Sequence, residues 1–88
     1  MEAYPVPFDL DRTRPATLVL RNASAETLRW VRVEMLGPGL ASAPLTPRLD
    51  PGDHIEVKVR GDDLGTSSRV IVRWLRPSGG EYLWGIAL

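Results

Sequence analysis

The end of the chain, residues 69–88, has the sequence RVIVRWLRPSGGEYLWGIAL and decides the fold. Two runs rich in Val, Ile, Trp and Tyr flank the segment Pro77-Ser78-Gly79-Gly80. Those side chains suit the pleated, packed surface of a sheet, whereas Pro and paired glycines suit a turn. The stretch therefore predicts a terminal β-hairpin around which the other strands assemble.

The length of the loop decides which side chains of the hairpin face the core, because side chains alternate across a sheet. A four-residue loop at 77–80 pairs Arg76 with Glu81 and Arg73 with Trp84. The inward face then carries Val70, Val72, Trp74, Leu83, Gly85 and Ala87, and the outward face carries Ile71, Arg73, Leu75, Tyr82, Trp84, Ile86 and Leu88. Arg73 assigns the second set to solvent, because an unpaired buried charge is costly. A bulge at Gly79-Gly80 is the alternative, and it places Trp84 inside.

The composition describes one small domain, which we place at residues 1–88. The chain has 88 residues, of which 43% are hydrophobic, and this is enough for a packed core. It holds no cysteine, so neither disulfide bonds nor thiolate metal sites stabilise it. The formal net charge is zero and the basic residues form no stripe, which argues against nucleic acid as a partner.

The sequence carries neither a membrane span nor a signal peptide, and the compartment stays open. No apolar run approaches the roughly 20 residues of a membrane span. The start, Met1-Glu2-Ala3, has neither the basic head nor the apolar segment of a signal peptide. We expect no membrane contact, and we take the cytoplasm as the default in the absence of any signal for another compartment.

Apolar side chains alternate by two in four further segments, at residues 4–10, 16–21, 28–36 and 54–60. Pro5 and Pro7 confine the first segment to a sheet edge. Residues 40–48 are irregular, with at most a short edge strand near Leu45, and residues 61–68 form a polar connection. Turn signals recur about every ten residues, and no amphipathic helix is predicted. The pattern predicts an all-β fold, an antiparallel β-sandwich of six to seven strands.

Two segments carry a family resemblance: TLVLRNASAETLRWVRVEM at 17–35 and LDPGDHIEVKVRG at 49–61. They resemble the bacterial immunoglobulin-like and fibronectin type III-like accessory domains. In those domains a strand ends in Asn with a small residue soon after, and an apolar-x-Pro-Gly-acidic turn begins a later strand. The matching residues are Asn22, Ser24, Leu49, Pro51, Gly52 and Asp53. The resemblance implies an immunoglobulin-like β-sandwich that binds or packs against something rather than catalysing a reaction.

Residues with catalytic or metal-binding chemistry are few. His54, the only histidine, lacks an adjacent nucleophile and an orienting group. Asp62 and Asp63 lack the ligand spacing of calcium loops, and the glycines at 37–39 and 79–80 lack the residues that follow a phosphate-binding loop. We therefore expect no enzyme activity, cofactor or metal, with a small hydrolase as a third and weaker alternative.

One group of residues points to binding. In an immunoglobulin-type sandwich the third strand lies in the same sheet as the last two. The exposed face of that sheet gathers side chains that anchor interfaces: Trp30, Arg32, Ile71, Arg73, Tyr82, Trp84 and Ile86. Arg73 lies across from Trp84 in the preferred register, at the right place for a cation–π contact. A monomer seldom exposes so apolar a face.

The sequence thus predicts a non-catalytic protein-interaction or self-association module, whose partner is another protein or a second copy of the chain. It uses the exposed face of the sheet that contains residues 28–36, 69–76 and 81–88. A carbohydrate-binding module is the alternative, because exposed Trp and Tyr side chains stack on sugar rings. A coplanar row of Trp30, Tyr82 and Trp84 favours sugar, whereas a compact patch rimmed by Arg and Glu favours protein.

Overall fold

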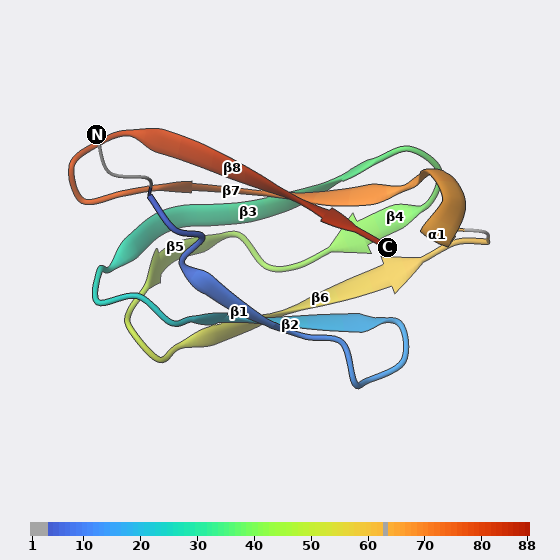
Figure 1. The fold of residues 1–88 in the computed structure, drawn as a ribbon, viewed down its shortest axis with the longest axis horizontal. Helices are drawn as coiled ribbons and strands as arrows, with labels where there is room; N and C mark the ends of the chain where they lie inside the picture. Colours follow the sequence, from blue (N-terminus) through green and yellow to red (C-terminus); the bar gives the residue numbers. More distant parts are fainter. Residues whose placement is uncertain (1–3, 63) are drawn as a thin grey trace.

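Two antiparallel four-stranded sheets pack face to face in the computed structural model, which describes residues 4–62 and 64–88 (Figure 1). The first sheet has the order β1 (Phe8–Asp11), β2 (Thr17–Asn22), β6 (His54–Arg60) and β4 (Leu40–Ser42). The second sheet has the order β5 (Thr46–Leu49), β3 (Leu28–Leu36), β7 (Arg69–Leu75) and β8 (Glu81–Ala87). The predicted all-β sandwich is confirmed, with eight strands in the described part of the chain rather than six or seven.

The alternation of apolar and polar residues explains why β6 forms and which way it faces. Ile55, Val57 and Val59 are buried, and the residues between them point outward. Branching at Cβ favours extended backbone, so Val and Ile stabilise the strand as well as the core. β2 pairs with β6 and adds Leu18 and Leu20 to the same inward face. The second sheet contributes Leu28, Val31, Leu49, Val70, Val72, Trp74 and Ile86 to the core.

Val57 and Val72 are fully buried on facing sheets, as the alternation predicts. Changing either one to Ala should lower the free energy of unfolding by roughly 1–3 kcal/mol, because packing contacts are lost and a cavity remains. Chemical denaturation measures the loss, and Val6→Ala, at a side chain that is 46% exposed, is the matched control. Losses below about 0.5 kcal/mol at both buried positions, the range of ordinary surface changes, would contradict their place in the core.

At one edge of the sandwich, two short consecutive strands take the chain from the first sheet to the second. β4 pairs with β6 in the first sheet, and β5 pairs with β3 in the second. The sequence predicts at most one short edge strand near Leu45, whereas the structure has two short edge strands, with Leu45 exposed between them. Pro44 and Pro47 hide the alternation, yet a sheet edge tolerates them because their missing N–H groups are not needed there.

The terminal hairpin forms where it was predicted, but its loop is one residue longer than the preferred register assumed. Residues 76–80 make the loop, and the Arg76 N–H donates to the Gly80 carbonyl at 3.0 Å to close it. Gly79 takes a φ of 95°, which a residue with a side chain rarely adopts. The preferred pairing of Arg76 with Glu81 is therefore wrong.

The shift by one residue turns every side chain of β8 over. Trp74 pairs with Tyr82 and Val72 pairs with Trp84, so the aromatic residues of β8 lie on the core side. Ile86 is buried, and Tyr82 and Trp84 are partly buried against the core. The side chains of β8 therefore face as the alternative register predicted, with Trp84 inside.

A β-bulge interrupts β3 between Arg29 and Arg32, where the pairing with β7 slips by one residue. Trp30 lies in this bulge with a φ of 51°, a left-handed conformation that is uncommon for a bulky side chain. Leu28 and Val31 are consequently both buried, although they are three residues apart. Bulges re-aim side chains, and this one leaves Trp30 47% exposed.

The connection before the hairpin holds a single helical turn, α1 (Leu64–Ser67), where the sequence analysis expected a polar loop. The Ser68 hydroxyl donates to the Pro38 carbonyl and ties this connection to the turn between β3 and β4. Asp63, which was weighed as a calcium ligand, lies outside the described residues. Over residues 4–62 and 64–88, no helix is long and apolar enough to cross a membrane.

Candidate functional site

The outer face of the second sheet is where the sequence analysis placed its binding residues. Alternation along β3 and β7 brings Arg32 opposite Arg73, and Leu83 of β8 stands beside Arg73 in the same row. The next row joins Glu34 to Ile71, with Gly85 beyond it. We call these residues, together with Trp30 and Glu81, the outer-face patch.

Two glutamates balance the two arginines at the centre of the patch. Arg32 Nη2 lies 3.1 Å from Glu81 Oε1, and Arg73 Nε lies 2.9 Å from Glu34 Oε1. Arg73 Nη1 also lies 3.5 Å from Glu81 Oε1, so that this carboxylate bridges both guanidinium groups. The hydrogen bond to Glu34 and the nearby negative charges raise the pKa of Arg73. Like charges directly opposed on a sheet repel, and the glutamates remove that repulsion.

These ion pairs are exposed, so they hold side chains in place more than they stabilise the fold. Solvent and salt screen such pairs strongly. A surface hollow of about 280 Å³ lies among Arg32, Val33, Glu34 and Arg73. The Arg32 Nη1 group also donates to the Trp30 carbonyl at 2.9 Å, which links the charged centre of the patch to the bulge.

Apolar side chains flank this charged centre. Trp30 is 47% exposed and Leu83 is 59% exposed, while Ile71, in the next row along the sheet from Leu83, is partly covered. Of the residues predicted for this face, Arg32, Ile71 and Arg73 share it in the structure, and Trp30 lies exposed in the bulge two residues before Arg32. Sequence reasoning missed Leu83, which the wrong register had turned inward.

The other three residues named for this face are not on it. The exposed position predicted for Tyr82, Trp84 and Ile86 is wrong, because the five-residue loop turns β8 over. The Trp84 ring stacks on Phe8 with centroids 6.3 Å apart, and the Tyr82 ring lies 4.7 Å from Tyr4. These contacts close the gap between the edges of the two sheets.

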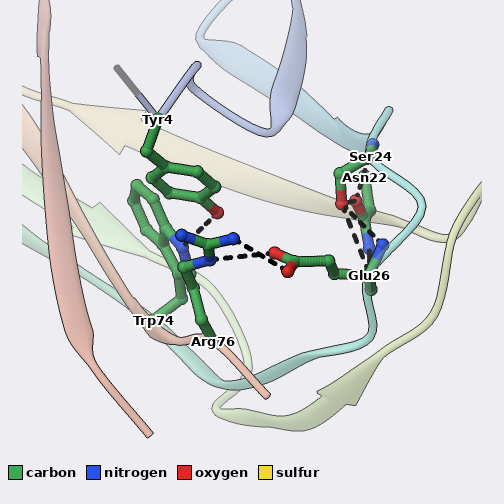
Figure 2. Close-up of polar contacts among 6 residues, drawn as sticks. All are labelled: Tyr4, Asn22, Ser24, Glu26, Trp74 and Arg76. Atoms are coloured by element: carbon green, nitrogen blue, oxygen red, sulfur yellow. Dashed lines mark hydrogen bonds and ion pairs between the residues drawn. The ribbon is translucent and has the colours of Figure 1, made fainter. Parts of the chain in front are cut away.

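The expected cation–π contact of Arg73 with Trp84 is replaced by another. Arg73 stands opposite Leu83, and it is Arg76 whose guanidinium lies 3.9 Å from the centroid of the Tyr4 ring. Figure 2 shows Tyr4 over Arg76, with Glu26 on its other side. Glu26 accepts two hydrogen bonds from Arg76, at 3.0 and 2.9 Å.

The ionisation of this second cluster fits a structural clamp. The Arg76 guanidinium lowers the pKa of Glu26, while hydrogen bonds to Glu26 and Tyr82 raise that of Arg76. Burial raises the pKa of Tyr4, whose hydroxyl accepts a hydrogen bond from Trp74 Nε1 at 3.2 Å. Each polar group is engaged within the domain, so the clamp fastens the N-terminal segment and offers little to a ligand.

Asn22, at the same end of the sandwich, is a polar residue that is completely buried. Its Nδ2 donates to the carbonyls of Glu26 and Leu49 at 2.8 and 3.0 Å. Its Oδ1 accepts from the N–H and the hydroxyl of Ser24 at 3.0 and 2.7 Å (Figure 2). Asn22 therefore satisfies backbone groups of the connection to β3 and of the end of β5. The residues that carried the family resemblance have a structural role here.

The remaining candidates from the sequence do not assemble into a reactive group. His54 is exposed at the start of β6, beside Asp9, Asp11 and Arg21 at a surface hollow. In the part of the chain that the structure describes, no three His, Cys, Asp or Glu side chains gather closely enough to hold a metal ion. Comparisons with protein-family models, with curated proteins and with solved structures found no match for this chain.

Proposed function

We propose that the domain is a non-catalytic protein-interaction module that binds through the outer-face patch of its second sheet. One observation carries this proposal: Trp30 and Leu83, 47% and 59% exposed, belong to the same sheet as a group of arginines and glutamates that pair with one another on its outer face. Trp and Arg are the residues that most often anchor protein interfaces.

The chemistry of the patch suits another protein surface. Apolar side chains gain free energy when a partner removes them from water, and the charged groups between them select partners of complementary charge. Arg32, Arg73, Glu34 and Glu81 are already held by one another, so less side-chain entropy is lost on binding. An unmatched partner would leave these charges desolvated and unpaired, which provides specificity.

The geometry supports this reading over carbohydrate binding. A row of coplanar aromatic rings was the feature expected of a sugar site. Tyr82 and Trp84 are directed to the core side, which leaves Trp30 as the exposed ring of the three. One exposed aromatic residue on a sheet whose outer face holds a cluster of Arg and Glu favours a protein partner over a sugar.

A selection from a displayed peptide library, combined with sedimentation of the domain at rising concentration, tests the proposal. Trp30→Glu and Leu83→Glu should each weaken a selected peptide, or self-association, by about tenfold or more, because each places an unmatched charge in the contact. Leu40→Glu is the matched control, since Leu40 is 69% exposed but lies on the first sheet, and it should leave binding unchanged.

Circular dichroism first establishes that the variants fold. Two results together would contradict the proposal. The wild-type domain would sediment as a monomer at every concentration, and no selected peptide would respond to Trp30→Glu or Leu83→Glu.

A further inference from the structure

The free edge of β8 differs from the other sheet edges. β1 has four residues with Pro7 just before it, β4 has three residues, and β5 has four residues and contains Pro47. Short strands, prolines and charges are devices that keep sheet edges from pairing with other chains. β8 has seven regular residues with no proline, and Glu81 at its start is its only charge. It is the one long, unguarded edge among the described strands.

The hydrogen bonds of the hairpin show which backbone groups of β8 are left over. The Arg76 N–H donates to the Gly80 carbonyl, and the Leu88 N–H donates to the Ser68 carbonyl. Because hydrogen-bonded and non-hydrogen-bonded pairs alternate along an antiparallel ladder, every second pair between these two is hydrogen-bonded. In the pairs between them, which are not hydrogen-bonded, the β8 residue directs its N–H and C=O groups away from β7. On β8 these are Glu81, Leu83, Gly85 and Ala87. Within the described residues, no backbone hydrogen bond reaches this edge from another segment.

A row of alternating donors and acceptors at this spacing matches an extended main chain, since another strand presents the same groups. A second β8, running antiparallel, is such a strand. One register uses all four free residues: Leu83 meets Gly85 of the partner subunit, and Glu81 meets Ala87 of the partner subunit. Shifting this register by two residues leaves one end of each strand without a partner.

The side chains also complement one another in this register. On the outer face, each Leu83 lies over Gly85 of the partner subunit, where no side chain competes for space. Each Glu81 lies over the small Ala87 of the partner subunit, and Arg69 stands next to that alanine on β7. On the core side, Trp84 lies against its own copy near the two-fold axis. One patch thus matches itself, as a two-fold contact requires.

We infer that two copies of the domain pair through the edges of β8, which joins their second sheets into one continuous sheet. This inference rests on the proposed function and specifies its partner as a second copy and its contact as a strand edge. Leu83 takes part in both, because it belongs to the outer-face patch and lies on the edge strand.

The most direct test removes one N–H donor on the outer edge of β8 and leaves the hydrogen bonds between β7 and β8 in place. Gly85→Pro deletes an N–H that points away from β7, and an edge strand tolerates proline in that orientation. Its control is Gly85→Ala, whose new Cβ would meet Ile71 at an ordinary 3.5 Å and which keeps the donor. Analytical ultracentrifugation should show that the wild type dimerises, and Gly85→Ala, which adds a Cβ at the contact but keeps the N–H, provides the reference value for the proline variant. For Gly85→Pro the dimer dissociation constant should rise about tenfold or more, because the change acts twice in a symmetric contact.

Amide exchange measured by NMR on the wild type gives a second test that needs no variant. The amides of Leu83, Gly85 and Ala87 should exchange more slowly at high protein concentration. Wild type that stays monomeric, or shows no such slowing, overturns the inference and leaves the peptide test of the outer-face patch standing. A dimer that survives Gly85→Pro but is lost with Trp30→Glu also overturns it, and locates the contact on the sheet face instead.

Discussion

Replacing Trp74 with Ala is expected to lower the free energy of unfolding by roughly 3–5 kcal/mol. Trp74 is only 2% exposed and is the largest side chain in the core, so that its removal leaves a cavity that neighbouring residues fill poorly. Its ring also contacts Phe8 edge-on, with centroids 5.2 Å apart, and stacks against Tyr82. A domain of this length has a total stability of the order of 5–10 kcal/mol, so the variant should lose about a third or more of it and unfold at a clearly lower temperature. Urea denaturation followed by far-ultraviolet circular dichroism measures the change.

Trp74→Phe separates packing from hydrogen bonding at the same position. It keeps an aromatic ring but loses the Nε1–H that donates to the Tyr4 hydroxyl. We expect a smaller loss, and a double-mutant cycle with Tyr4→Phe should show coupling of about 0.5–1.5 kcal/mol. Equal losses for Trp74→Ala and Trp74→Phe would contradict the importance of the buried ring.

Replacing Asn22 with Ala should cost roughly 2–4 kcal/mol of unfolding free energy, a large effect for a side chain so small. The physical reason is desolvation: the carbonyls of Glu26 and Leu49 would remain at a buried site without their donor. Asn22→Asp tests this at nearly constant shape, because a carboxylate accepts hydrogen bonds but cannot donate to those two carbonyls.

Ser24→Ala is the control for Asn22, since it removes a single hydroxyl at a partly exposed position. Its loss should stay below about 1.5 kcal/mol. Thermal and urea unfolding of the three variants provide the comparison. A loss for Asn22→Ala as small as that for Ser24→Ala would show that water replaces the missing donor.

Much of the fold follows from period-two alternation. β6 is the clearest case, because Ile55, Val57 and Val59 alternate with polar residues and leave one choice of inward face. The strands near residues 40–49 could not be found in this way, because each has only three or four residues and prolines interrupt the pattern. Their pairing is determined by the two sheets they join, which is information that local sequence does not hold.

The candidate site was predicted in part, and its errors share one physical cause. The face of the sheet on which each β8 side chain lies depends on the number of residues in the loop. One residue more than predicted in the loop at 76–80 turns β8 over. A signal against the wrong register was present. Tyr82, Trp84 and Ile86 together bury far more apolar area than Leu83, Gly85 and Ala87, so the larger set belongs inside. The bulge at Trp30 left no such signal, although its consequence, an exposed Trp30, was predicted.

The short strands β4 and β5 join the two sheets at one side of the sandwich, so the two sides are held together in different ways. On that side, continuous backbone joins the two sheets, and they cannot separate without breaking strand pairs. On the opposite side, the rings of Tyr4 and Phe8 against Tyr82 and Trp84 hold β1 and β8 together by side-chain contacts. We therefore expect local unfolding to cost least at the β1–β8 side, with residues 40–49 as the hinge.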